Sequence, residues 1–251
     1  MAKESTQQKA PTNPNLPLFY SNPVPLDQRR NPPLLFNKSI GYGFTEGVNA
    51  VPLNMVEFSQ AAGSMPIAFS PDATATPVAV LGLRDGENLY LDNKKQWLND
   101  AYIPAYVRRY PFIFAAVPNS DQYGLCLDET DQTIAKKDGE RIFDDAGEPT
   151  ELAKNAMEFC KSYHAAALGT QALSKALVDL DLLVERQVDI KVKDKQIRFA
   201  GFRIVDEKKL NELPDDKFMD LKKRGFLPFI YAHLISNVQW NRLTQLLMKQ
   251  M

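Results

Sequence analysis

Cysteine and histidine are scarce in this chain of 251 residues. The two cysteines, Cys126 and Cys160, belong to no CxxC or Cys/His motif, and the two histidines, His164 and His233, show no H-x-D or H-E-x-x-H spacing. These absences argue against a zinc site, a disulfide-stabilised fold and a metal enzyme. We therefore expect no metal, no cofactor, and two buried thiols in a reducing compartment.

The sequence also lacks a long apolar run and an excess of charge of one sign. "PVAVLGL" and "FIFAAV" are too short to cross a bilayer, and "MAKESTQQKAPTNPN" has no apolar run after its lysine, so it predicts no signal peptide. Lys plus Arg (30) nearly balances Asp plus Glu (31), and this balance disfavours nucleic-acid binding. We expect a cytoplasmic protein with no membrane insertion.

Motifs of the common enzyme and nucleotide-binding classes are missing as well. "GYGFTEG" lacks the GxGxxG spacing, and the chain contains no GxSxG. The acid–glycine turns in "LRDGEN" and "DAGEP" do not match the order of oxygen ligands in a calcium loop. Composition and motifs therefore leave the reaction, if there is one, unspecified.

Residues 1–33 hold seven prolines and few aliphatic side chains. Such a composition cannot bury enough apolar surface to fold alone. We expect a flexible Pro-rich arm, or a segment that lies extended on the domain, with "PLFY" at 17–20 as a docking anchor. Residues 34–251 are assigned to a single domain.

The first half of that domain reads as one short helix followed by strands and hairpins. "VPLNMVEFSQAAGS" predicts the helix, and strands follow in "MPIAFS", "TPVAVLGLR", "FIFAAV" and "YGLCLDE". The Asp85–Gly86 pair predicts a hairpin turn between a strand that ends near Leu83 and a strand at 88–91.

The second half begins with a period of three to four residues that predicts one long amphipathic helix at 152–180. A hairpin follows at 187–206, with its turn at Asp194 and Lys195, and two helices are predicted after it. The last 25 residues begin as a buried strand or as the start of a helix, and they end as a helix. Hairpins outnumber βα units. The predicted fold is therefore α+β, with a mixed or mainly antiparallel sheet packed by the long helix and the C-terminal helices.

Eight phrases, in this order, resemble the SapC family of bacterial proteins from about residue 47 to 243: "VPLNMVEF", "MPIAF", "VAVLGLRDGENLYLD", "YIPAYVRRYPF", "LCLDE", "FDDAGEPT", "GFRIVDEKKL" and "FLPFIYAHLIS". The family takes its name from surface-layer loci, where such a protein is encoded with the export machinery of the layer. The resemblance implies an accessory role in surface-layer biogenesis or export. It identifies no set of catalytic residues that could be carried over to this chain.

The segment "YIPAYVRRYPF" contains the leading candidate site. Prolines at 104 and 111 disfavour helix at the residue before each, so we expect an extended segment with Tyr106, Arg108 and Tyr110 on one face and Arg109 on the other. A buried guanidinium keeps its proton and needs acceptors. Two interpretations follow: an ion pair with a carboxylate such as Glu57 or Asp128, or a ligand site for a carboxylate or phosphate walled by tyrosines.

His233, in the apolar "IYAHLIS", is expected to be a hydrogen-bonded core residue, with a ligand or general-base role as the alternative. The terminal helix and the N-terminal arm are candidate surfaces for a protein partner, and the oligomeric state is left open. Our leading interpretation is a non-catalytic cytoplasmic accessory protein. The alternative is an enzyme or small-ligand receptor built around Arg108, Arg109, Tyr106, Tyr110, Glu57 and His233.

Overall fold

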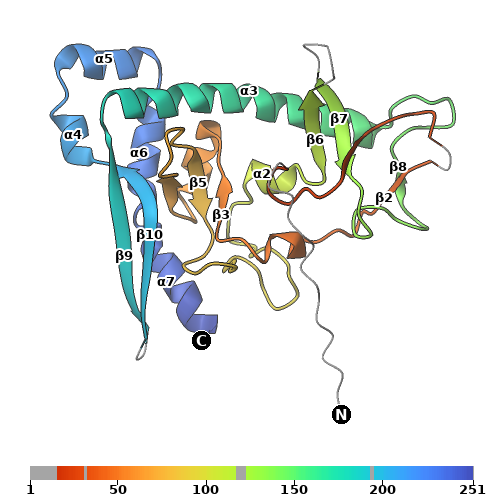
Figure 1. Cartoon of the computed structure of the whole chain (residues 1–251), viewed down its shortest axis with the longest axis horizontal. Coiled ribbons are helices and arrows are strands. Elements are labelled where there is room, and N and C mark those ends of the chain that lie inside the picture. The colour runs from red at the N-terminus through yellow and green to blue at the C-terminus, as the bar shows by residue number, and fades with distance from the viewer. Residues whose placement is uncertain (1–15, 31–32, 117–122, 193–194, 251) are drawn as a thin grey trace.

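The chain folds as two main antiparallel sheets joined by one long helix, which confirms the predicted α+β class (Figure 1). The computed structural model describes residues 16–30, 33–116, 123–192 and 195–250. The larger sheet has five strands in the order β3 (Ala50–Pro52), β5 (Pro77–Val80), β4 (Ile67–Phe69), β10 (Lys195–Val205) and β9 (Leu183–Val192).

A second sheet has three strands, and a third sheet has two strands. The strand order of the three-stranded sheet is β1 (Pro23–Pro25), β7 (Tyr123–Asp128) and β6 (Phe112–Ala116). The two-stranded sheet pairs β2 (Leu35–Phe36) with β8 (Glu140–Arg141). Every strand pair among the described residues is antiparallel, in agreement with the hairpin-rich sequence.

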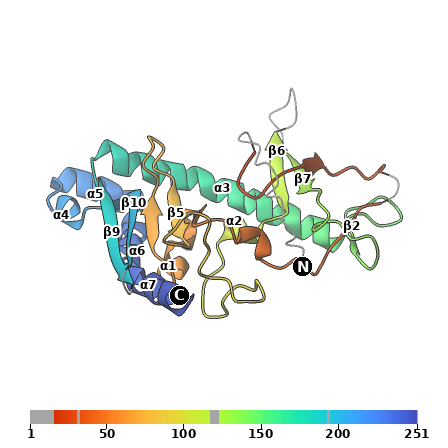
Figure 2. The same cartoon turned by 60° about the horizontal axis from the view of Figure 1, so that its bottom comes forward.

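The predicted long helix is α3 (Glu151–Asp179), which runs along both sheets (Figures 1 and 2). Its C-terminal half packs Leu173 and Leu177 into the core of the five-stranded sheet. Its N-terminal half packs Ala153 and Cys160 against the three-stranded sheet. Apolar residues at helical spacing thus bury one stripe of α3 along its length, and the helix holds the two sheets in a fixed relation.

The C-terminal helices cover the larger sheet. They are α4 (Glu207–Asn211), α5 (Asp215–Lys223), α6 (Leu227–Ser236) and α7 (Gln239–Gln250). α6 contacts β4, β10 and the short α1 (Phe58–Ala61), which continues from the 3-10 helix η2 (Met55–Glu57). Leu243 and Leu247 of α7 are fully buried, so most of the apolar side of this helix packs into the core.

The described part of the N-terminal segment lies on the domain. Tyr20 is buried, and Val24 in β1 pairs with Leu127 in β7. Phe19 packs edge-on against Phe44 with ring centroids 5.1 Å apart. Within residues 16–30, β1 is extended and paired with β7, and turns occur at 18–19 and 28–29; residues 1–15 and 31–32 of the predicted arm lie outside the described residues.

The hairpin predicted around Asp85–Gly86 is wrong. Gly86 does adopt the left-handed turn conformation, with φ 72°, but residues 83–91 form no strand. The Asn88 side chain instead donates to Thr45 Oγ1 at 2.9 Å and accepts from the backbone N–H of Tyr90 at 2.9 Å. The Asn88 side chain thus satisfies a backbone N–H group within the turn and ties the turn to Thr45.

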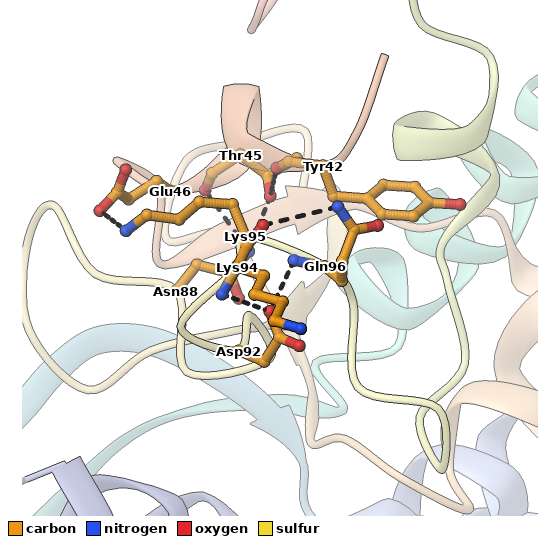
Figure 3. A network of polar contacts seen from close by, with 8 residues as sticks. All are labelled: Tyr42, Thr45, Glu46, Asn88, Asp92, Lys94, Lys95 and Gln96. Carbon is orange, nitrogen blue, oxygen red and sulfur yellow. Dashed lines mark hydrogen bonds and ion pairs between the residues drawn. The ribbon is translucent and has the colours of Figure 1, made fainter. Parts of the chain in front are cut away.

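The loop after this turn is held in the same way (Figure 3). Asp92 Oδ1 accepts from the backbone N–H groups of Lys94 and Gln96, both at 2.8 Å. Lys95 has φ 59° and pairs with Glu46, which follows the short 3-10 helix η1 (Gly43–Thr45). Local Asx bonds, long-range polar contacts and one isolated antiparallel bridge between Leu91 and Trp97, rather than a continuous strand ladder, therefore organise residues 83–96.

Candidate functional site

The arginine segment contains a short helix where we expected an extended chain. α2 (Ala105–Arg108) begins directly after Pro104, and Pro111 comes three residues beyond its last residue. Each proline restricts the residue before it, Ile103 and Tyr110, and leaves the residues between them free to turn. The predicted alternation of faces is therefore wrong, because the side chains of α2 follow helical spacing.

Glu57 holds the start of α2. Its side chain is buried, and Oε1 accepts from the Ala105 N–H at 2.6 Å and from the Tyr102 hydroxyl at 2.9 Å. Its Oε2 accepts from the Asn54 N–H at 3.0 Å, which closes a capping box on η2. No arginine approaches this carboxylate within ion-pair distance in the described part of the chain, so Glu57 positions α2 and does not neutralise an arginine.

Arg108 lies on the surface beside Tyr102. Its Nε donates to the Ile103 carbonyl at 3.0 Å and its Nη2 donates to the Tyr102 hydroxyl at 3.1 Å. The guanidinium carbon lies 5.3 Å from the ring centroid of Phe159 in α3 and 5.7 Å from that of Tyr102. The guanidinium of Arg108 thus has uncharged acceptors and aromatic neighbours.

Arg109 is surrounded by three tyrosines, which we call the tyrosine cage: Tyr20, Tyr106 and Tyr163. Its guanidinium carbon lies 4.5 Å from the ring centroids of Tyr106 and Tyr163 and 5.5 Å from that of Tyr20. Its Nε is buried without a hydrogen-bond partner, and no ion pair to Arg109 exists among the residues that the structure describes. The expected pairing with Glu57 or Asp128 is therefore wrong for this arginine too.

The electrostatics of the cage keep its hydroxyls neutral. Burial raises the pKa of Tyr20, Tyr106 and Tyr163, and the nearby Arg109 charge lowers each pKa only in part. Burial also raises the pKa of Cys160 to about 11. At neutral pH, Arg109 is thus the only charged group in the cage.

Asp128 fastens the N-terminal segment that carries Tyr20. The fully buried carboxylate accepts from the backbone N–H groups of Ser21 at 2.8 Å and Asn22 at 2.6 Å, and from the Tyr110 hydroxyl at 3.1 Å. Its proximity contributes, after burial, to the raised pKa of Tyr110. The second carboxylate that we expected to pair with an arginine is thus used to hold Tyr20 over Arg109.

The backbone of this segment is tied to α2 and β6 as well. The Tyr106 hydroxyl donates to the Leu18 carbonyl at 3.1 Å, and the Tyr20 hydroxyl donates to the Phe112 carbonyl at 2.7 Å. The Tyr163 hydroxyl has no hydrogen bond among the described residues. The hydroxyls of Tyr20 and Tyr106 thus fasten the N-terminal segment to β6 and α2.

His233 belongs to α6, which lies apart from α2 in Figure 1. The side chain is fully buried, and its Nε2 accepts from the Val205 N–H at 3.0 Å, which assigns the proton to Nδ1. Burial lowers its pKa to about 4. This histidine shares no contact with the cage, so Arg108, Arg109, Tyr106, Tyr110 and Glu57 gather around α2 without it.

Two cage residues were not among the predicted site residues. Tyr163 lies on the helical stripe of α3, where periodicity indicates only core packing. Tyr20 lies in the N-terminal arm, 89 positions before Arg109. The pattern of "PLFY" indicated an anchor but not what it would contact, since no local signal predicts a contact between residues so far apart in sequence.

Comparison with known proteins places the chain in a family. The family model described as SapC matches residues 26–243. The chain belongs to the SapC family. No curated protein and no solved structure matches it.

Two further observations complete the description of this SapC chain. Among the described residues, no helix is both long and apolar enough to cross a membrane. In the same part of the chain, no three His, Cys, Asp or Glu side chains are grouped so that they could hold a metal ion. The feature that stands out in the site is therefore the unpaired charge of Arg109.

Proposed function

We propose that this SapC protein acts by binding, and that Arg109 in the tyrosine cage receives a carboxylate or phosphate group of the ligand. The observation that carries the proposal is the guanidinium with aromatic faces around it and no anion beside it. Glu57 and Asp128, the carboxylates expected to pair with an arginine, accept hydrogen bonds from backbone N–H groups and tyrosine hydroxyls instead.

The charge of Arg109 persists in the cage because a guanidinium does not lose its proton in proteins. Cation–π contacts contribute about 0.5–2 kcal/mol each, and the Nε donor of the guanidinium is left without a hydrogen-bond partner among the described residues. An oxyanion would accept charge-assisted hydrogen bonds from the planar fork. The Tyr163 hydroxyl, which makes no hydrogen bond with a described residue, is a second donor at the same place, so the cage offers one charge and one neutral donor to a ligand.

The surroundings of Arg109 favour binding over catalysis. The tyrosine hydroxyls and the Cys160 thiol stay protonated at neutral pH, because burial raises their pKa values. A general base or an ionised nucleophile is what an enzyme would need beside the ligand. His233, the histidine weighed for that role, packs against Phe69 in a different part of the core.

The resemblance of the sequence supports a finer proposal: binding at Arg109 is an accessory step in surface-layer biogenesis or export, carried out in the cytoplasm. Deleting the chain from a bacterium that builds such a layer tests this. Complementation by the wild-type chain should restore the assembled layer, and complementation by Arg109→Lys should not.

Thermal unfolding with added anions tests the binding itself. The probes are inorganic phosphate, acetate, succinate and a short peptide, each at constant ionic strength against chloride. A ligand at about 100 times its dissociation constant stabilises the fold by about 2.7 kcal/mol, which corresponds to a melting-temperature increase of several degrees, at about 2–4 °C per kcal/mol.

Arg109→Lys should abolish this increase, because lysine keeps the charge and loses the planar fork. The matched control is Arg29→Lys, since the Arg29 side chain is 84% exposed and its ion pair among the described residues is with Asp27, two positions earlier. A carboxylate or phosphate that raises the midpoint equally in the wild type and in Arg109→Lys, or no increase with any probe, would refute binding at the cage.

A further inference from the structure

β9 forms the free edge of the five-stranded sheet. It has 10 residues, Leu183–Val192, and pairs on one side with β10 (Figures 1 and 2). Among the described residues, no backbone group of β9 bonds to any element other than β10. A strand of this length with a free row of N–H and C=O groups is a template for a further strand.

The charges along β9 select the register in which a second copy could pair with it. In an antiparallel ladder, only alternate residues direct their N–H and C=O groups toward the neighbouring strand. When two identical strands pair in this way around a two-fold axis, residues that face each other are an even number of positions apart. One residue therefore lies on the axis, opposite its own copy. If most of β9 is to be paired, that residue is Arg186, Gln187, Val188 or Asp189. Each choice sets the charge pairs across the new ladder.

Three of these registers place like charges opposite each other. Centring on Arg186 sets this arginine against itself, centring on Gln187 sets Glu185 against Asp189, and centring on Asp189 sets that aspartate against itself. Centring on Val188 sets Glu185 opposite Lys191, twice by symmetry, and contains no like pair. Opposite charges across a ladder stabilise it and like charges destabilise it, so β9 is complementary to itself in this register alone.

The surface beside β9 supports the same partner. Val188, Ile204 and Trp240 line a groove between the β9–β10 hairpin and the junction of α6 with α7. At this junction Ile235 is 63% exposed and Val238 is 61% exposed. A second β9 would extend the sheet beside this groove, which Arg186, Gln187 and Asn237 also line, and would set the partner's apolar Val188 opposite Val188.

We propose that two copies of this chain pair through β9, antiparallel and centred on Val188, to form one sheet that is continuous across both copies. This dimer does not depend on the ligand proposed for Arg109. The two features involve different elements, α2 with the N-terminal segment on the one hand and the β9 edge on the other, so each can be refuted without the other.

Charge exchange across the new ladder tests the register. The wild-type chain should sediment as a dimer with twice the mass of the 28.3 kDa chain. Glu185→Lys and Lys191→Glu each replace two attractive pairs by two repulsive ones, and each should raise the dimer dissociation constant about tenfold or more. The double variant restores opposite charges in inverted order and should return the constant to within about threefold of wild type.

The control is Glu151→Lys at the exposed start of α3, which makes the same charge change away from β9 and should leave the dimer intact. Far-UV circular dichroism of every variant separates loss of the dimer from loss of the fold. A wild-type chain that stays monomeric at its highest soluble concentration would overturn the proposal. Two weakened single variants whose double variant is weakened further would also overturn it.

Discussion

Removing the Glu57 carboxylate should destabilise the protein more than any exposed acidic substitution. Glu57→Ala leaves the backbone N–H groups of Asn54 and Ala105 without their acceptor in a buried place. Each unsatisfied buried donor costs about 1–3 kcal/mol, so the free energy of unfolding should fall by about 2–6 kcal/mol. The Tyr102 hydroxyl loses its acceptor as well.

Glu57→Gln should fall between wild type and alanine. The amide oxygen can take the place of Oε1 and keep the bonds from Ala105 and Tyr102, while the amide nitrogen then faces the Asn54 N–H. One bond of three is lost, so the expected decrease is about 1–3 kcal/mol. The free energy of unfolding should therefore decrease in the order wild type, Glu57→Gln, Glu57→Ala, because the two carboxylate oxygens accept from different donors.

Urea unfolding followed by circular dichroism measures these differences. The control is Glu158→Gln, because the Glu158 side chain is 70% exposed in an ion pair along α3; its effect should stay below about 1 kcal/mol. Glu57→Ala within about 1 kcal/mol of wild type would refute the role of this carboxylate in holding α2. Glutamine as damaging as alanine would show that the charge, rather than the acceptor at Ala105, is what the fold needs.

Two more substitutions test His233 in the core and Asp128, which binds the N-terminal segment that carries Tyr20. The pKa of His233 in the folded protein is about 4, below its ordinary value of 6.5, so the unfolded chain binds the proton first as the pH falls. The free energy of unfolding should therefore be highest above pH 6.5 and should decrease by about 3 kcal/mol by pH 4, compared with His233→Gln. Urea unfolding of both proteins at each pH measures this difference. Asp128→Ala frees the N–H groups of Ser21 and Asn22, so trypsin should cleave within residues 16–30 faster than in wild type, as mass spectrometry of the fragments would show. An unchanged fragment pattern would mean that other contacts hold the segment.

The elements that sequence reasoning found are those with a strong local period. α3 follows from apolar residues every three or four positions, and β9 with β10 follows from alternation. The hairpin at Asp85–Gly86 was wrong although its turn residues are present. The bonds that override it join Asn88 to Thr45, and nothing in the turn itself announces a partner 43 positions away.

The candidate site was found in part for the same reason. Two adjacent arginines among tyrosines in "YIPAYVRRYPF" marked the segment, and chemistry required acceptors or aromatic faces for any buried guanidinium. Which carboxylate or ring would supply them depended on contacts between segments far apart in the chain. Glu57 and Asp128 are buried, but they accept hydrogen bonds from backbone N–H groups and tyrosine hydroxyls, and Arg109 packs against three tyrosine rings.

The sequence alone therefore determined the α+β class, the long helix, the family and the segment in which charge meets aromatic rings, because periodicity, composition and short motifs are local. The tertiary structure decided that Arg109 has no carboxylate, that Tyr20 and Tyr163 face it, and that β9 is an edge. Those facts arise where segments distant in the chain meet, and the energies that place them come from packing and hydrogen bonds that no single segment contains.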